Sequence, residues 1–108
     1  MISLEQAVNL LNKLNVSLDN FSIKDFLIGY KIELEHGTRD PRTNVTNDDP
    51  IITSKIALAH LYEYPDYYNE QYGLPALERF LESNKGQWFF YCPLFYLLSK
   101  YFFKNIPV

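Results

Sequence analysis

The sequence predicts an all-α protein, a compact bundle of four or five short helices with one long, packed polar loop. Apolar residues recur at helical spacing in several segments, and capping residues or prolines stand where those segments begin. No segment shows the sustained alternation that is typical of a strand, and no hairpin dipeptide occurs. At 108 residues, the chain is expected to fold as a single domain over residues 1–108.

The first two predicted helices begin at capping residues. Ser3 opens a capping box ahead of a helix over residues 4–14. Ser22 is the expected N-cap of a second helix, which ends at Gly37, a residue that can adopt positive φ. Gly29 lies in the middle of this helix, where it costs roughly 1 kcal/mol relative to alanine, so a role in close contact is expected. The two apolar stripes are expected to comprise Leu4, Val8, Leu11 and Leu14, and then Ile23, Phe26, Leu27, Tyr30 and Leu34.

A polar loop over residues 38–49 separates the second predicted helix from the third. This is long for a connection between helices, so we expect the loop to pack against the helix ends. Asp49 and the proline that follows it predict the start of the third helix. A Tyr-Pro pair ends that helix, and shorter helices are predicted over residues 65–72 and 75–82. The buried face of the third helix is expected to contain Ile52, Ile56, Leu58, Ala59 and Leu61.

The C-terminal extension over residues 74–108 is rich in aromatic side chains. Nine of the chain's eighteen aromatic residues lie between Trp88 and Phe103. A transmembrane helix needs roughly 20 apolar residues, whereas this run is shorter and contains Pro93 and Lys100. The pattern therefore favours a core or an oligomer interface, with a membrane surface as the less favoured alternative.

Composition excludes some classes of function and favours one compartment. The formal net charge of −3 gives no basic footprint for nucleic acid. The single cysteine, Cys92, cannot form an internal disulfide, which fits a reducing compartment. The N-terminus has no signal-peptide pattern, so the expected location is the cytoplasm of a cell or a host, with a virion as an alternative.

Both histidines of the chain belong to helical pairs with a glutamate. Glu33 and His36 are three residues apart near the end of the second predicted helix, and His60 and Glu63 repeat the spacing in reverse order on the third. A Glu-x-x-His pair on a helix is an element of metal sites in helical bundles, because carboxylate and imidazole converge on one ion. These four residues are the candidate ligands of a divalent transition metal.

The alternative is a structural network without a cofactor. His36 would donate to the unpaired carbonyls at the end of its helix, and His60 would bond into the loop over residues 38–49. The Asn and Asp residues of that loop would cap the third helix and one another. The sequence favours this interpretation over a bound ion.

The central part of the chain contains four motifs in order, ELEHGT at 33–38, TNVTNDDP at 43–50, KIALAHL at 55–61 and PDYY at 65–68. In these motifs it resembles a small domain family of unknown function that we associate with bacteria, phages and large DNA viruses. The family-like part covers about residues 3–72, with serine at position 54 where the family commonly has glycine. The aromatic extension inherits nothing from the resemblance. The resemblance implies a binding or structural polar cluster of Glu33, Glu35, His36, Asn44, Asp48, Asp49, His60, Asp66 and Tyr67.

The sequence favours a small, non-catalytic binding or assembly module, encoded by a virus or mobile element. It would act through a protein partner, with self-association through the aromatic extension. The alternative is a metal-binding domain, with hydrolysis as its activity, that uses Glu33, His36, His60 and Glu63. No phosphate-binding glycine loop or Cys-x-x-Cys pair occurs, and Cys92 has no histidine near it in sequence, so a catalytic role is not favoured.

Overall fold

The computed structural model describes residues 1–84, and this part of the chain contains helices and no strands, which confirms the all-α class. The four α-helices are α1 (Leu4–Lys13), α2 (Ile23–Glu33), α3 (Pro50–Glu63) and α4 (Leu74–Ser83). A 3-10 turn, η1 (Leu34–His36), continues α2. Residues 88–103 lie outside the described residues, so the prediction for the aromatic run stays a prediction.

The helices begin where the capping residues predict. The hydroxyl of Ser3 accepts from the amide of Gln6, whose side chain accepts from the Ser3 amide in return. Ser22 and Asp25 form the same reciprocal pair at the start of α2. The carboxylate of Asp49 accepts from the first free amides of α3, which stabilises that helix end.

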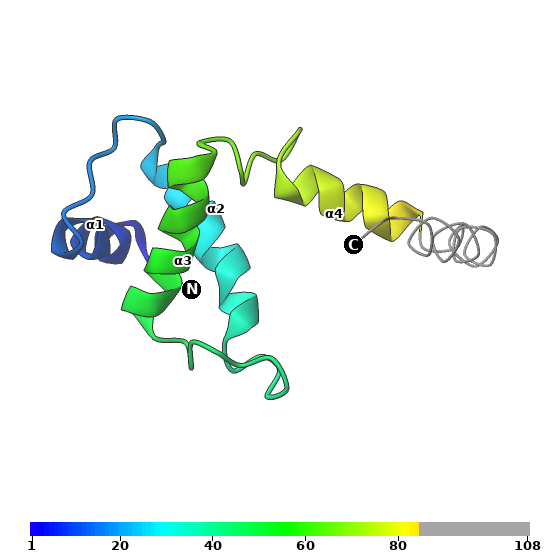
Figure 1. The fold of residues 1–108 in the computed structure, drawn as a ribbon. Helices are drawn as coiled ribbons and strands as arrows, with labels where there is room; N and C mark the ends of the chain where they lie inside the picture. Colours follow the sequence, from blue (N-terminus) through cyan, green and yellow to red (C-terminus); the bar gives the residue numbers. More distant parts are fainter. Residues whose placement is uncertain (85–108) are drawn as a thin grey trace, which may run out of the picture.

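Helices α2 and α3 lie side by side and cross at the centre of the fold, and α1 packs against both (Figure 1). Helix α4 extends away from these three (Figure 1). The hydrophobic core lies between α1, α2 and α3, with contributions from the segments that connect and follow them. It comprises Ala7, Leu10, Leu11, Phe21, Phe26, Tyr30, Ala57, Leu58, Leu61 and Tyr68. Within residues 1–84, every helix is too short or too polar to cross the lipid bilayer.

The predicted buried faces of α1 and α3 were partly wrong. Leu4 and Val8 are exposed, and α1 instead buries Ala7 together with two leucines. On α3, Ile52 and Ala59 are exposed, whereas the helix buries the small residues Thr53, Ser54 and Ala57 with Leu58 and Leu61. Small side chains allow the helices to approach closely, and spacing alone does not show which of two adjacent stripes turns inward.

Gly29 has the close-contact role that its position predicted. A Cβ atom at this position would lie 2.5 Å from Cε2 of Tyr68 and 2.7 Å from its Cδ2. The Tyr68 ring therefore lies directly on the backbone of α2, and its side chain is almost fully buried. Only glycine leaves the space that this ring occupies.

The polar loop packs against the end of η1 and the start of α3. The amides of Val45 and Thr46 both donate to the carbonyl of His36. The Asp48 carboxylate accepts from the amide and the hydroxyl of Thr38, which closes the loop at its base. Two consecutive residues, Asn47 and Asp48, adopt left-handed backbone conformations, which Asn and Asp tolerate better than most residues.

The predicted reason for Gly37 was wrong. Its φ is −102°, so the end of the helix does not require a positive φ here. A Cβ atom at Gly37 would instead collide with the carboxylate of Asp48. The glycine is needed because the closed loop brings that side chain against the backbone.

The predicted helix over residues 65–72 is absent. The segment forms consecutive turns, in which Tyr67 donates to the carbonyl of Tyr64 and Asn69 to that of Asp66. The side chain of Asn69 accepts hydrogen bonds from the amides of Gln71 and Tyr72, so it competes with a helical hydrogen-bond pattern. These turns direct Tyr68 back into the core.

Gly29→Ala should destabilise the protein, although alanine favours helix by about 1 kcal/mol. The added methyl group overlaps the buried Tyr68 ring, and such overpacking costs about 1–3 kcal/mol. The measurement is the midpoint of chemical denaturation. In a double-mutant cycle with Tyr68→Leu, the loss should be smaller than the sum of the single losses. A higher midpoint for Gly29→Ala alone would contradict the contact.

Ser54→Ala should stabilise the protein by about 1 kcal/mol, because the buried hydroxyl of Ser54 has no hydrogen-bond partner in the described part of the chain. Ser22→Ala is the matched control, since it removes the N-cap of α2 and should cost about 0.5–2 kcal/mol. Denaturation midpoints that move in opposite directions would confirm both roles. A loss on Ser54→Ala would mean that the hydroxyl is satisfied in solution.

Candidate functional site

The candidate site is built around Glu33, a carboxylate that is only 2% exposed at the last position of α2. The hydroxyl of Tyr68 donates to Glu33 Oε1 at 2.5 Å, inside the protein. A buried carboxylate needs such a donor, because an unpaired charge in a low-dielectric environment is strongly unfavourable. This hydrogen bond joins the end of α2 to the turns that follow α3.

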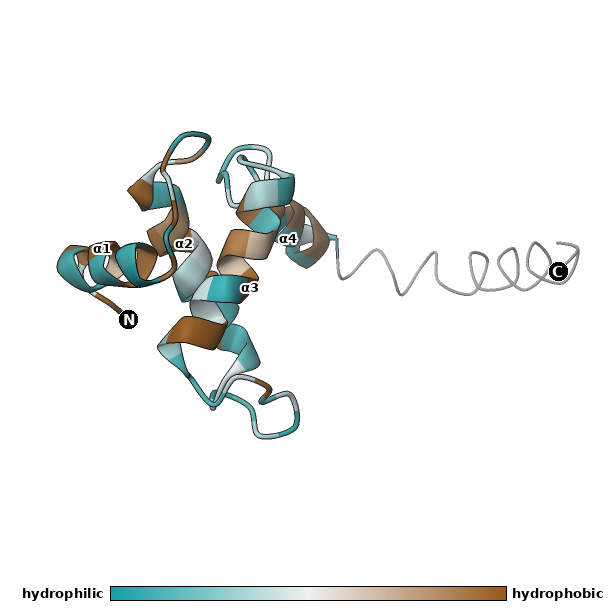
Figure 2. Cartoon of the chain, turned by 60° about the vertical axis from the view of Figure 1, so that its left-hand side comes forward, coloured by the Kyte–Doolittle hydropathy of each residue, from teal (hydrophilic) through white to brown (hydrophobic). Residues whose placement is uncertain are grey.

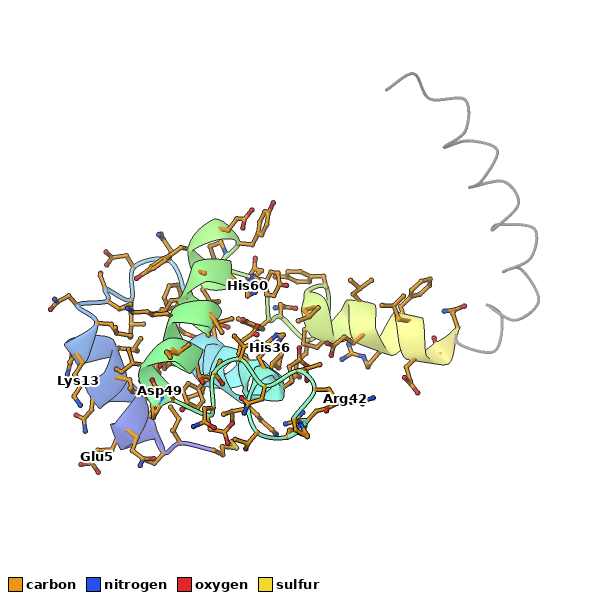
Figure 3. The ribbon with its side chains drawn as sticks, turned by 60° about the horizontal axis from the view of Figure 1, so that its bottom comes forward. Glu5, Lys13, His36, Arg42, Asp49 and His60 are labelled. Atoms are coloured by element: carbon orange, nitrogen blue, oxygen red, sulfur yellow. The ribbon has the colours of Figure 1, made fainter. Side chains whose placement is uncertain are left out.

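Both imidazoles of the chain lie close to this carboxylate. The two histidines are labelled in Figure 3. His36 Nε2 lies 3.3 Å from Glu33 Oε2. His60 Nε2 lies 3.7 Å from Glu33 Oε1. His36 comes from η1 and His60 from α3, so the crossing of α2 and α3 brings residues that are distant in sequence to one carboxylate.

Two tyrosines fix the imidazole of His60. Its ring stacks on Tyr67, with the ring centroids 4.1 Å apart and the planes 7° from parallel. Tyr68 meets the same imidazole edge-on at 6.1 Å, and it meets Tyr67 edge-on at 4.9 Å. The stacked and edge-on geometries are those that aromatic rings prefer. Consecutive tyrosines thus hold His60 from two sides.

Glu35 adds a second carboxylate beside His36. Its Oε1 lies 3.5 Å from His36 Nε2. One ligand atom each from Glu33, Glu35 and His36 lies within 4.8 Å of the others. The side chains of Glu35 and His36 are each 44% exposed and that of His60 is 35% exposed, so the cluster opens to solvent above the buried Glu33.

The hydroxyl of Tyr68 stays protonated at neutral pH. Burial raises the pKa of Tyr68 far above its ordinary value, and the hydrogen bond to the Glu33 carboxylate raises this pKa further. Burial, followed by the negative charge of Glu33, also raises the pKa of Tyr67. The Tyr68 hydroxyl therefore keeps its proton and donates it to Glu33 in a hydrogen bond.

The other predicted site residues lie outside this cluster. Asp48 closes the loop on Thr38, whose hydroxyl and amide hold the pKa of the Asp48 carboxyl below its usual value. Asp49 caps α3. The side chain of Asn44 accepts from the amide of Asn47 and so shapes the loop.

Two predicted residues are exposed and do not join the cluster. Asp66 contributes its backbone carbonyl to a turn. Glu63 lies at the end of α3 and is not among the described residues whose ligand atoms gather around Glu33. The ligand atoms that gather within 4.8 Å of one another come from Glu33, Glu35 and His36, so Glu35 enters the candidate set and Glu63 leaves it. His60 lies outside this close group and, among its three residues, contacts Glu33 alone, at 3.7 Å.

The predicted roles of the two histidines in a structural network need correction. His60 contacts Glu33 and the two tyrosines rather than the loop over residues 38–49. The imidazole of His36 faces carboxylates instead of helix-end carbonyls, while its own backbone carbonyl holds the loop. Sequence reasoning also missed the role of Tyr68. Two features of the sequence could have indicated this role. They are Gly29 in the middle of a helix and the pair Tyr67-Tyr68 that follows Pro65.

A second candidate surface lies on α4, where no residue is buried. Leu77, Phe80 and Leu81 are all about half exposed or more, and their spacing places them on one face of the helix. Hydrophobic residues recur along α4 among hydrophilic ones (Figure 2). The start of the helix is attached to the bundle through the Leu74 amide, which donates to the carbonyl of Tyr67.

Comparison with known proteins gives one match. A family model described as "Protein of unknown function (DUF5661)" matches residues 7–78. The matched range contains every residue of the polar cluster and the first part of α4. No curated protein and no solved structure matches the chain.

Tyr68→Phe should lower the free energy of unfolding by about 1.5–3 kcal/mol, because it removes a hydrogen bond to a buried, charged carboxylate. Tyr67→Phe is the matched control, since its ring can still stack on His60 and its hydroxyl has no hydrogen bond within the described residues. That variant should change stability by less than about 0.5 kcal/mol. Urea denaturation of both variants measures the difference, and equal losses would contradict the assigned role of Tyr68.

Proposed function

The chain belongs to the DUF5661 family, and for this member we propose a role as an assembly module that self-associates through α4. The observation that carries the proposal is the apolar face of α4, formed by Leu77, Phe80 and Leu81. The partner that we propose for this face is the same face of a second copy of the chain.

The three apolar residues share one face of α4 rather than being scattered singly over the surface. Leu77 is 52% exposed, Phe80 is 61% exposed and Leu81 is 47% exposed. Burying one such side chain completely is worth about 1.5–3 kcal/mol, so three on one helix face provide a strong drive to association. Contiguous exposed apolar residues on a protein surface often mark an interaction site.

The apolar face continues onto the turns before α4. Tyr64 is 59% exposed and Tyr72 is 66% exposed, and with Leu77 they line a pocket of roughly 390 Å³. The pocket also contains Tyr67, whose other contacts hold His60. A groove beside an exposed helix face can receive side chains from a second molecule.

The base of α4 is fixed, so the face is presented in one direction. Gly73 allows the backbone to approach Asp66, Tyr67 and Asn69 closely, where a Cβ atom would collide. The guanidinium of Arg79 donates to the carbonyl of Glu70 and ties the first turns of the helix to the preceding segment. A preoriented helix needs less ordering when it binds.

A second copy is the simplest occupant, because two-fold pairing of one patch with itself is the commonest form of oligomer. The sequence supports this choice. Twenty-four residues follow Asn84, and nine of them are aromatic, so each chain carries further apolar side chains directly after α4.

Light scattering on the full chain tests the proposal. The parent protein should run above its monomer mass of 12.8 kDa and approach that mass only on dilution. Leu77→Glu and Phe80→Glu should each shift the protein to the monomer, because a buried, unpaired charge opposes pairing.

Leu18→Glu is the matched control. Leu18 is 46% exposed but lies in the connection between α1 and α2, far in sequence from the α4 face. This variant should associate like the parent. A parent chain that stays monomeric at high concentration, together with loss of stability in Leu77→Glu, would show that the chain covers the face of α4 itself, and this would overturn the proposal.

A further inference from the structure

We infer that the group of side chains around Glu33 is a binding site for one first-row divalent metal ion, and that Zn²⁺ is the ion that its geometry suits best. Three of its ligands would be Glu33, Glu35 and His36, whose ligand atoms lie within 4.8 Å of one another. His60, whose Nε2 lies 3.7 Å from Glu33 Oε1, would supply the fourth. This inference does not rest on self-association through α4. It rests on ligand type, on the spacing of the ligand atoms and on the contacts that hold them.

The first observation is that the imidazoles approach the carboxylates without hydrogen bonds. The three contacts between imidazole nitrogen and carboxylate oxygen measure 3.3, 3.5 and 3.7 Å. Charge-assisted hydrogen bonds between such groups are about 2.7–2.9 Å long. Among the described residues, neither imidazole forms a side-chain hydrogen bond with Glu33, whose bonded donor is Tyr68.

The second observation is that the separations of His36 Nε2 from Glu33 and Glu35 match those between ligands of a tetrahedral ion, and the ligand atoms of these three residues all lie within 4.8 Å of one another. Zn²⁺ lies about 2.0–2.2 Å from nitrogen and oxygen ligands, so tetrahedral geometry places neighbouring ligand atoms about 3.3–3.6 Å apart. The contacts of His36 with Glu33 and Glu35 fall in this range. The contact of His60 with Glu33 is 0.1 Å longer than the upper value of this range.

The third observation is that groups outside the ligand set orient the ligands. The Tyr68 hydroxyl fixes Oε1 of Glu33, and the Tyr67 ring fixes the plane of His60. Metal-binding side chains are typically held in this way by neighbouring hydrogen bonds and packed groups. The cluster also has a route for an ion, because three of the four ligand side chains are partly exposed.

The ligand types define the chemical class of the ion. Two imidazoles and two carboxylates suit Zn²⁺ and its first-row neighbours, whereas Ca²⁺ and Mg²⁺ prefer oxygen ligands alone. An ion at this position would join η1, α2 and α3, which otherwise meet around a buried negative charge. Its binding would therefore stabilise the folded chain.

Titration of the chelator-treated full chain with ZnCl₂ in a calorimeter tests the inference. One equivalent of Zn²⁺ should bind, and the melting temperature should rise with its concentration. Co²⁺ absorbs visible light strongly in a tetrahedral site, which has no inversion centre, and weakly in an octahedral one, so the Co²⁺-loaded protein should give the intense band of a tetrahedral site. His60→Ala and His36→Ala should each weaken Zn²⁺ binding more than tenfold, and Tyr68→Phe should weaken it 10–100-fold.

Glu63→Gln is the matched control and should bind Zn²⁺ with the affinity of the parent, because Glu63 is not in the cluster. A thermal melt of each variant without metal shows whether the variant folds. His36 and His60 are both partly exposed, so their alanine variants should fold. Absence of saturable binding to the parent, or parental affinity in folded His60→Ala, would overturn the inference.

Discussion

The side chain of Tyr68 passes over the backbone of α2 at Gly29 and donates its hydroxyl to Glu33, so one residue both packs in the core and satisfies the buried charge. The rest of the site depends on this contact. Without it, the Glu33 carboxylate would lack its donor, and His60 would lose the ring that meets it edge-on. The turns after α3, which bond Tyr67 to Tyr64 and Asn69 to Asp66, bring this tyrosine into the core.

The sequence predicted the features that are set by local chemistry. The starts of α1, α2 and α3 follow from Ser3, Ser22 and Asp49, whose side chains bond to amides only two or three residues away. The closed polar loop was also predictable, because a long run of Asn, Asp and Thr can satisfy its own backbone. The proximity of Glu33 and His36 could be predicted from their helical spacing alone.

The remaining features depend on how the helices cross, and this crossing cannot be predicted from the spacing of apolar residues. Helical spacing allowed two inward stripes on α3, and the stripe with Thr53 and Ser54 turned inward although it buries two hydroxyls. His60 reaches Glu33 rather than the loop for the same reason. The choice of Glu35 over Glu63 beside the histidines also required the three-dimensional arrangement, since both glutamates lie close to a histidine in sequence.

The bond between Thr38 and Asp48 has a consequence for the order of folding. It closes a loop of only ten residues, whereas the bond between Glu33 and Tyr68 spans thirty-five. Short closures cost less chain entropy and form sooner, so the loop can bring α3 to α2 before Tyr68 is in place. We expect weakening of the Asp48 contact to slow folding, and weakening of the Tyr68 contact mainly to hasten unfolding. The polar cluster would then be the last part of the molecule to assemble and the first to come apart.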